Sequence, residues 1–188
     1  MTTDCSSSPT DDRRPARSRR WPWRAVAMAA LVAAVADAAF AFVAYVLIAG
    51  RFNFETLLQY IASGLLGDAA FTTGWMGIAT ATLGFAIHVG LAVVFTAFYA
   101  VVISPRVHTL ATASVLGVAY GAGIWMVMNA VVLPLGRAVR EPFLSGYYLA
   151  FGVDHALLVG LPIALILCIS APAAPPRQGA RIKPHNGG

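Results

Sequence analysis

Four long apolar runs alternate with short polar segments along this chain. The runs cover residues 25–49, 75–103, 110–135 and 146–170. A helix needs about 20 mostly apolar residues to cross the hydrocarbon core of a bilayer, so each run is long enough to span it. Backbone polar groups must be satisfied within the segment in lipid, which only a helix achieves for a single run. The pattern therefore predicts an all-α membrane protein, a four-transmembrane-helix bundle over residues 25–170.

A shorter amphipathic segment, residues 54–66, lies between the first and second runs. Asn53 can cap its N-terminus and Gly67 can end it. Its apolar positions recur at helical spacing on one side and its polar positions on the other. The apolar side holds Phe54, Leu57, Leu58, Ile61 and Leu65, and the polar side holds Glu55, Gln59 and Ser63. We predict an interfacial helix in the first external loop, with its apolar face against lipid or the other helices. A packed re-entrant loop is the alternative.

Composition favours a membrane protein over a soluble domain. The chain is 59% hydrophobic and 11% charged, whereas soluble domains are about 25% charged. The first run resembles a signal peptide, because arginines precede it and Ala36-Asp37-Ala38 is a small-residue pattern like that of a cleavage site. It continues apolar through Ile48, however, and a signal peptide has an apolar region of only about 7 to 15 residues. We predict a retained first transmembrane helix.

Basic residues are distributed unevenly around the runs. Six of the 13 precede the first run, Arg106 lies between the second and third, and three follow the fourth. The others lie in the external loops, and they are Arg51, Arg137 and Arg140. Cytoplasmic segments are enriched in Lys and Arg, so we expect a bacterial inner-membrane protein with both termini in the cytoplasm. The polar tails, residues 1–24 and 171–188, are expected to be disordered. Since the net charge of +5 arises at the ends of apolar runs, the expected contact is with lipid and not with nucleic acid.

Polar side chains inside the runs occur at matching depths. Asp37 lies 12 residues from the outer end of the first run at Ala49, and His88 lies 13 residues from the outer end of the second run at Trp75. With a rise of about 1.5 Å per residue, these two positions have nearly the same depth. We therefore predict that Asp37 and His88 meet near the centre of the bundle.

A second polar layer is predicted nearer the outer face. Asn129 lies six residues from Leu135, and Asp154 lies eight residues from Gly146 with His155 next to it. A charged side chain at mid-bilayer costs at least about 2 to 3 kcal/mol, so each of these groups needs a partner. The two layers either form a proton or ion path or fix the helix register through interhelical hydrogen bonds of about 0.6 kcal/mol each. The sequence leaves both interpretations open.

None of these residues forms a recognised catalytic or metal-binding motif. Two His and two Asp could coordinate zinc, but they are not paired at i, i+4 as in HExxH, so we assign no metal ligand and no cofactor. Cys5 and Cys168 lie in a polar tail and an apolar run, which offers no disulfide framework. The chain has no nucleophile elbow or phosphate loop. We expect a protein that is not an enzyme.

Glycine and proline positions indicate how the helices pack and end. Gly117 and Gly121 form a GxxxG pattern in the third run, where small residues let another helix approach, and we expect that contact to be within the bundle. Proline disfavours a helical residue before it and blocks one helical hydrogen bond. We therefore expect the second run to end at Pro105, the third to end at Pro134, and the fourth to kink at Pro162.

The spacing of a few of these residues resembles a known family. The relevant positions are His88, Phe95 and Tyr99 in the second run, Gly121, Asn129 and Pro134-Leu135-Gly136 in the third, and His155 in the fourth. In these positions the chain resembles the YagU-like four-span inner-membrane proteins of bacteria, over residues 74–167. The resemblance implies an inner-membrane protein with a link to acid or envelope stress, and it implies no catalytic residues.

Two functional hypotheses follow. The first is a small non-enzymatic membrane protein that acts through interactions within the bilayer, as a homo-oligomer or with another membrane protein. It rests on the short loops and the GxxxG pattern. The alternative is an oligomeric transporter or channel that moves protons, ions or a small solute along a polar path. That path would be lined by Asp37, His88, Asn129, Asp154 and His155.

Overall fold

The computed structural model describes residues 23–136 and 146–171, and every regular element within these ranges is helical. Four helices are long and apolar enough to cross a membrane, and they are Trp23–Ile48, Gly74–Arg106, Leu110–Leu135 and Tyr148–Ile169. The fold class is therefore the predicted all-α four-helix bundle. Most of the two predicted tails, and the loop that carries Arg137 and Arg140, lie outside the described residues.

Each spanning helix contains a π-helical stretch. The first span consists of α1 (Trp23–Ala41) and η1 (Phe42–Ile48), and the second of α3 (Gly74–Phe98), η3 (Tyr99–Ile103) and the 3₁₀ turn η4 (Ser104–Arg106). The third consists of α4 (Leu110–Val127), η5 (Met128–Val132) and α5 (Leu133–Leu135), and the fourth of α6 (Gly146–Asp154), η6 (His155–Gly160) and α7 (Leu161–Ile169). Before α3, the chain forms α2 (Phe54–Leu66) and the 3₁₀ turn η2 (Gly67–Ala70). Such π-helical segments are frequent at functional sites.

The second and third spans end within one to three residues of the predicted positions. The second span continues past Pro105 to Arg106, because Ser104 keeps a helical backbone with φ −56° and ψ −31° and Pro105 fits the first positions of a 3₁₀ turn. The third span likewise includes Pro134 and ends one residue later. In the fourth span, η6 ends two residues before Pro162. A proline removes one helical hydrogen bond and crowds the carbonyl four residues earlier, which accounts for a widened turn there.

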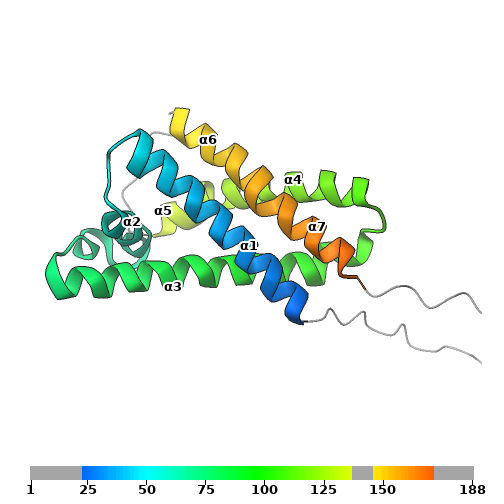
Figure 1. Cartoon of the computed structure of the whole chain (residues 1–188), viewed down its shortest axis with the longest axis horizontal. Coiled ribbons are helices and arrows are strands. Elements are labelled where there is room, and N and C mark those ends of the chain that lie inside the picture. Colours follow the sequence, from blue (N-terminus) through cyan, green and yellow to red (C-terminus); the bar gives the residue numbers. More distant parts are fainter. Residues whose placement is uncertain (1–22, 137–145, 172–188) are drawn as a thin grey trace, which may run out of the picture.

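The four spans form two crossed pairs (Figure 1). In that view α1 and the α6–α7 helix descend side by side across α3 and α4. The first span packs against α3 and α7, and the fourth packs against α4. The start of α1, the turn between α3 and α4, and the end of α7 lie at one end of the bundle, while α2 and α5 lie at the other. The two outermost described ends of the chain are therefore on the same side.

Small side chains let α1 approach the other helices closely. Ala25, Ala29 and Ala33 recur on one face of α1 and are buried in a core that includes Ile163 and Leu167. On the outside, large apolar side chains are exposed on all four spans, among them Leu31, Phe85, Val115 and Leu157. Extensive apolar exposure of this kind suits lipid and not water. Together with the four long apolar helices, it defines an integral, multi-pass membrane protein.

The glycines of the GxxxG pattern pack against the fourth span of the same chain. A Cβ atom added to Gly121 would lie 2.0 Å from the carbonyl oxygen of His155, and one added to Gly160 would lie 2.2 Å from that of Gly117. Only glycine fits such an approach of two backbones. The contact fixes the height of His155 relative to α4.

The α2 helix buries polar side chains as well as the apolar Leu57. Gln59 and Ser63 are buried against α3, whereas Phe54 and Leu65 are exposed. The Gln59 side-chain amide donates hydrogen bonds to the carbonyl oxygens of Thr72 at 2.9 Å and Gly77 at 3.2 Å. In an apolar surrounding a polar side chain finds partners only within the protein, so the polar face turns inward. The packing of α2 on α3 fits the packed alternative in this respect, and the interfacial position of α2 stays a prediction.

Candidate functional site

Four titratable side chains from three spans meet inside the bundle. Asp37 comes from α1, His88 from α3, Asp154 from the last residue of α6, and His155 from the first residue of η6. The Nδ1 atom of His88 is 3.6 Å from Oδ2 of Asp37, and the Nδ1 atom of His155 is 3.8 Å from Oδ1 of Asp37 and 3.3 Å from Oδ2 of Asp154. We call these four residues the acid–imidazole cluster.

His88 is oriented by a backbone carbonyl. Its Nε2 atom is 3.0 Å from the carbonyl oxygen of Ala34 on α1. A carbonyl can only accept a hydrogen bond, so Nε2 carries a proton. In a neutral His88 the Nδ1 atom is then an acceptor that faces the carboxylate of Asp37. Two acceptors face each other favourably only when a proton or another cation lies between them, so this contact is a place where either can be held.

His155 is oriented in the same way by its own helix. Its Nδ1 atom lies 2.9 Å from the carbonyl oxygen of Phe151, which requires Nδ1 to be the donor. The same N–H group faces carboxylate oxygens of both Asp37 and Asp154. The side chain of Asp154 has no exposed surface, and neither of its oxygens has a hydrogen-bond partner of standard geometry among the described residues. An ionised carboxylate is disfavoured in such a place without a partner, so Asp154 depends on His155.

The structure joins two predicted layers into one. The predicted meeting of Asp37 and His88 is observed, but Asp154 and His155 lie at the level of Asp37 and do not form a separate outer layer with Asn129. The Asn129 side-chain amide donates instead to the carbonyl oxygen of Trp125 on its own helix, at 2.8 Å. Counting residues from each run's end assumed that all four spans begin at one level, and the contacts across the cluster show that they do not.

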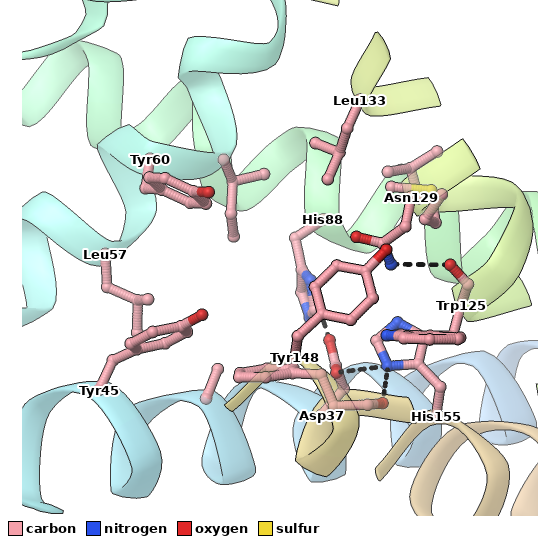
Figure 2. Close-up of a pocket in the computed structure, with 15 residues that line it drawn as sticks. Asp37, Tyr45, Leu57, Tyr60, His88, Trp125, Asn129, Leu133, Tyr148 and His155 are labelled. Carbon is pink, nitrogen blue, oxygen red and sulfur yellow. Dashed lines mark hydrogen bonds and ion pairs between the residues drawn. The ribbon is translucent and has the colours of Figure 1, made fainter. Parts of the chain in front are cut away.

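A cavity of about 470 Å³ opens above the cluster, and we call it the large cavity. Asp37, His88 and His155 line one end of it, and Asn129 also lines it. Figure 2 shows His88 and Asp37 on the floor of this space, with Tyr45, Leu57 and Tyr60 on one side and Trp125 and Asn129 on the other. Its volume falls within the range of about 300 to 1,000 Å³ that is typical of small-molecule sites.

Aromatic side chains form much of the wall of the large cavity. They are Tyr45, Tyr60, Trp125, Tyr148 and Phe151. The Tyr45 and Phe151 rings stack with centroids 5.2 Å apart, and the Trp125 and Tyr148 rings meet edge to face at 4.8 Å. In Figure 2 the hydroxyl groups of Tyr45 and Tyr60 point toward the middle of the space. The sequence analysis missed these residues as site residues, because aromatic side chains near the ends of spans usually mark the membrane interface.

A second, smaller cavity of about 90 Å³ lies on the other side of the cluster. The two cavities share five lining residues, and they are Asp37, His88, Leu91, Met128 and His155. Near the small cavity, which Phe95 lines, α3 and α4 are joined by a side-chain contact. There the Tyr120 hydroxyl donates a hydrogen bond to the carbonyl oxygen of Phe95 at 2.8 Å, and its ring lies edge-on to the buried Tyr99 with centroids 5.1 Å apart.

The cluster can hold protons or a cation. Two carboxylates and two imidazoles carry a net charge between −2 and 0 as they take up two protons, and an apolar surrounding favours the neutral state. Asp37, Asp154 and His155 also offer three ligand atoms within 4.8 Å of one another, a set that could hold a metal ion although the sequence pattern predicts none. The Nδ1 proton of His155, which bonds Phe151, would have to be displaced for that atom to ligate.

Comparison with known proteins adds no family. No protein-family model, curated protein or solved structure matches this chain. The function is therefore argued from the cavity and the cluster alone.

Proposed function

We propose that the protein is a proton-linked carrier of a small solute in the bacterial plasma membrane, with both termini in the cytoplasm. The observation that carries the proposal is the position of the acid–imidazole cluster between the two cavities. A carrier needs a binding group that both sides of the membrane can reach in turn, and a group that lines both cavities is suited to that role.

The chemistry of the cluster supplies the link to protons. A solute that brings a positive charge or hydrogen-bond donors to Asp37 takes the place of a proton held between Asp37 and His88. His155 and Asp154 can redistribute their shared proton at the same time, because the Nδ1 proton of His155 faces both carboxylates. A poorly solvated cluster is most stable when its net charge is close to zero, so a positive solute that binds there favours the release of protons.

The proposal also identifies the part of the bundle that must move. In this proposal the large cavity is the site of solute entry, and on the side of the small cavity the hydrogen bond from Tyr120 to Phe95 joins α4 to α3. Release on that side requires α3 and α4 to separate there. The π-helical stretches of the four spans are places where a helix can change its hydrogen-bond register during such a movement.

A role through intramembrane interactions has less support. The GxxxG glycines that favoured it already pack against Gly160 in the same chain, so this face is not offered to another protein. A link to acid stress, which the YagU-like resemblance implies, would suit a proton-linked carrier.

Reconstituted vesicles test the proposal. The protein is placed in liposomes that contain a pH-sensitive dye, and a panel of amines, amino acids and sugars is added outside with and without a membrane potential. We expect at least one solute to change the internal pH in vesicles with the native protein and in those with Asp68→Asn, and not in those with Asp37→Asn or in empty vesicles. Asp68 is a suitable control because it is an exposed carboxylate outside the cavities. Absence of any solute-dependent or potential-dependent pH change would overturn the proposal.

A further inference from the structure

We infer that the large cavity binds an organic ammonium ion, with its charged nitrogen against Asp37 and its apolar substituents against the aromatic wall. This inference rests on the proposed function only in taking the large cavity as the solute's binding site. It names the class of solute, which the proposed function leaves open.

The charges around the large cavity favour a cation. Asp37 lines it, and Asp154 adds a second carboxylate behind His155. None of the described residues that line the cavity is Lys or Arg. The two imidazoles are the only lining groups that can become positive, and each already has one N–H group directed at a backbone carbonyl. A positively charged solute would complete the neutralisation of the carboxylates without requiring both imidazoles to be protonated.

The size and walls of the cavity favour an organic cation over an inorganic one. A volume of about 470 Å³ far exceeds what a bare ion needs. A small inorganic ion would have to keep its water shell or replace it with oxygen ligands, and the walls beyond the cluster are mainly aromatic and aliphatic. Ala41, Leu57, Ile61, Leu91, Met128 and Leu133 complete the apolar lining. An ammonium ion with hydrocarbon substituents loses less hydration on entering such a space and gains apolar contact.

Aromatic rings line the space that the cation would occupy. A cation is attracted to the face of an aromatic ring within about 6 Å of its centroid, and quaternary ammonium groups are commonly recognised in this way. Phe151 is held by rings on two sides, since Tyr45 stacks on it and Phe40 meets it edge to face at 5.1 Å. Phe151 is also the residue whose carbonyl oxygen orients His155. One residue therefore joins the aromatic wall to the cluster.

Protons should compete with the organic cation. The titratable groups that line the space are Asp37 and Tyr45 from the first span, Tyr60 from α2, His88 from α3, and Tyr148 and His155 from the fourth span, with Asp154 behind His155. Of these, the carboxylates lose negative charge and the imidazoles gain positive charge when they take up protons. Uptake of protons makes the cluster less negative, so binding of the cation is expected to weaken as the pH falls.

Direct binding measurements test the inference with benzyltrimethylammonium as the probe. The full chain is purified into lipid nanodiscs and titrated by calorimetry with this cation, with the uncharged benzyl alcohol and with Zn²⁺. We expect saturable binding of benzyltrimethylammonium that is at least about tenfold tighter than that of benzyl alcohol and that weakens from pH 8 to pH 6. Asp37→Asn should weaken the binding about tenfold or more, while Asp68→Asn should leave it unchanged.

A second pair of variants guards against a misfolded Asp37→Asn protein. Phe151→Leu leaves every carboxylate and imidazole in place and removes one aromatic face, and it should weaken binding of the cation several-fold. Phe85→Leu removes an exposed phenyl ring from α3 and should have no effect. Equal binding of the charged and neutral probes, saturable binding of Zn²⁺ alone, or no effect of Phe151→Leu would each overturn the inference.

The inference and the proposed function can fail separately. If benzyltrimethylammonium does not bind but a solute still changes the internal pH, the ammonium ligand is rejected and the proposed carrier function stands. Tight binding of the cation without any flux would reject the carrier and keep the site.

Discussion

The imidazole of His88 and the carboxylate of Asp37 face each other between α3 and α1, with 3.6 Å between Nδ1 and Oδ2. Because Nε2 of His88 donates a hydrogen bond to the carbonyl oxygen of Ala34, Nδ1 is the ring nitrogen that faces Asp37. The pair therefore ties α1 and α3 together. At this distance a small movement of either side chain would form a direct hydrogen bond, and a cation could also bind between the two atoms.

Breaking this pair should destabilise the bundle more than removing both partners. Losing one partner of a buried ion pair typically costs about 3 to 5 kcal/mol, whereas replacing both with apolar side chains can be nearly neutral. We expect Asp37→Leu and His88→Leu each to lower the melting temperature in detergent, and the double variant to recover most of the loss. In the double variant His155 still has Asp154 at 3.3 Å, so no carboxylate is left without an imidazole.

The control for these variants is Asp68→Leu, which removes an exposed carboxylate and should change the melting temperature little. If the losses of the two single variants simply add in the double variant, the side chains do not interact in the membrane-embedded protein.

Gly121 and Gly123 provide a matched test of the contact between the third and fourth spans. A Cβ atom at Gly121 would lie 2.0 Å from the carbonyl oxygen of His155, whereas one at Gly123 would meet nothing within 4 Å. Overpacking typically costs about 1 to 3 kcal/mol, and alanine in an open helical position gains up to about 1 kcal/mol. Gly121→Ala should therefore lower the thermal stability measured by circular dichroism, and Gly123→Ala should maintain or raise it. Equal effects of the two changes would contradict the observed packing.

The amide of Gln59 should hold α2 against α3. Its side chain donates to the carbonyl oxygens of Thr72 and Gly77 from a buried position. Leaving buried polar groups unpaired costs about 1 to 3 kcal/mol each. We expect Gln59→Leu to speed amide hydrogen exchange in residues 54–66 and to leave α4 unaffected. Thr82→Val is the control, because Thr82 is exposed on α3 and bonds only its own helix. Unchanged exchange in α2 would show that apolar contacts alone hold it.

The spans and the Asp37–His88 contact were predictable because both follow from position along the sequence, which sets depth in the membrane. A long apolar run must cross the bilayer as a helix, and a residue's depth follows from its position in the run. The position of Asp154 and His155 was not predictable in this way. It depends on which spans are neighbours and how far they slide along each other, and the close approach of Gly121 to the His155 carbonyl fixes that offset.

The burial of Gln59 and Ser63 on α2 was not predictable for a related reason. Amphipathicity shows that a helix has two faces, but it does not show which face meets protein when the surroundings are apolar. Gln59 finds carbonyl partners on the following segment, and Gly84 lets the backbone of Leu58 approach α3, where a Cβ would lie 1.9 Å from the Leu58 carbonyl oxygen. Neither relationship is visible as a periodicity. The aromatic wall of the large cavity was missed likewise, since it is gathered from four separate elements.

Membrane orientation is a separate prediction that rests on the arginine distribution. Reporter fusions placed after Arg106 and after Arg177 should report a cytoplasmic location, and fusions near Asp68 and Arg140 an external one. As a control, the arginines that precede Trp21 are replaced with Gln. This change reduces the excess of positive charge on the cytoplasmic side and should make the reporter locations less uniform. An external reporter after Arg177 would contradict an even number of spans in this orientation.

The hydroxyl group of Tyr120 should limit access to the cluster from the side of the small cavity. It donates to the carbonyl oxygen of Phe95 at 2.8 Å and so joins α4 to α3. The Tyr120 ring also stacks on Phe98 with centroids 6.2 Å apart and planes 6° from parallel. Tyr120→Phe keeps this ring packing and deletes the hydrogen bond, which typically contributes about 0.5 to 1.5 kcal/mol. The equilibrium between closed and open states should shift toward opening by that amount, about twofold to tenfold, with little change in thermal stability.

Cysteine labelling measures this shift. Ala92 lines the small cavity and not the large one. A cysteine at this position therefore reports access to the cluster from the side of the small cavity. Ala92→Cys is made in a chain whose native Cys5 and Cys168 are replaced by Ser. Labelling with a membrane-impermeant maleimide should be faster in the Tyr120→Phe background than in the parent when the reagent is on the side of the α3–α4 turn. Thr82→Val removes a hydroxyl elsewhere on α3 and should not alter the rate. Equal rates in all three proteins would mean that the Tyr120 hydroxyl does not limit opening, and α1 and α7, which also cover this end, would then have to move instead.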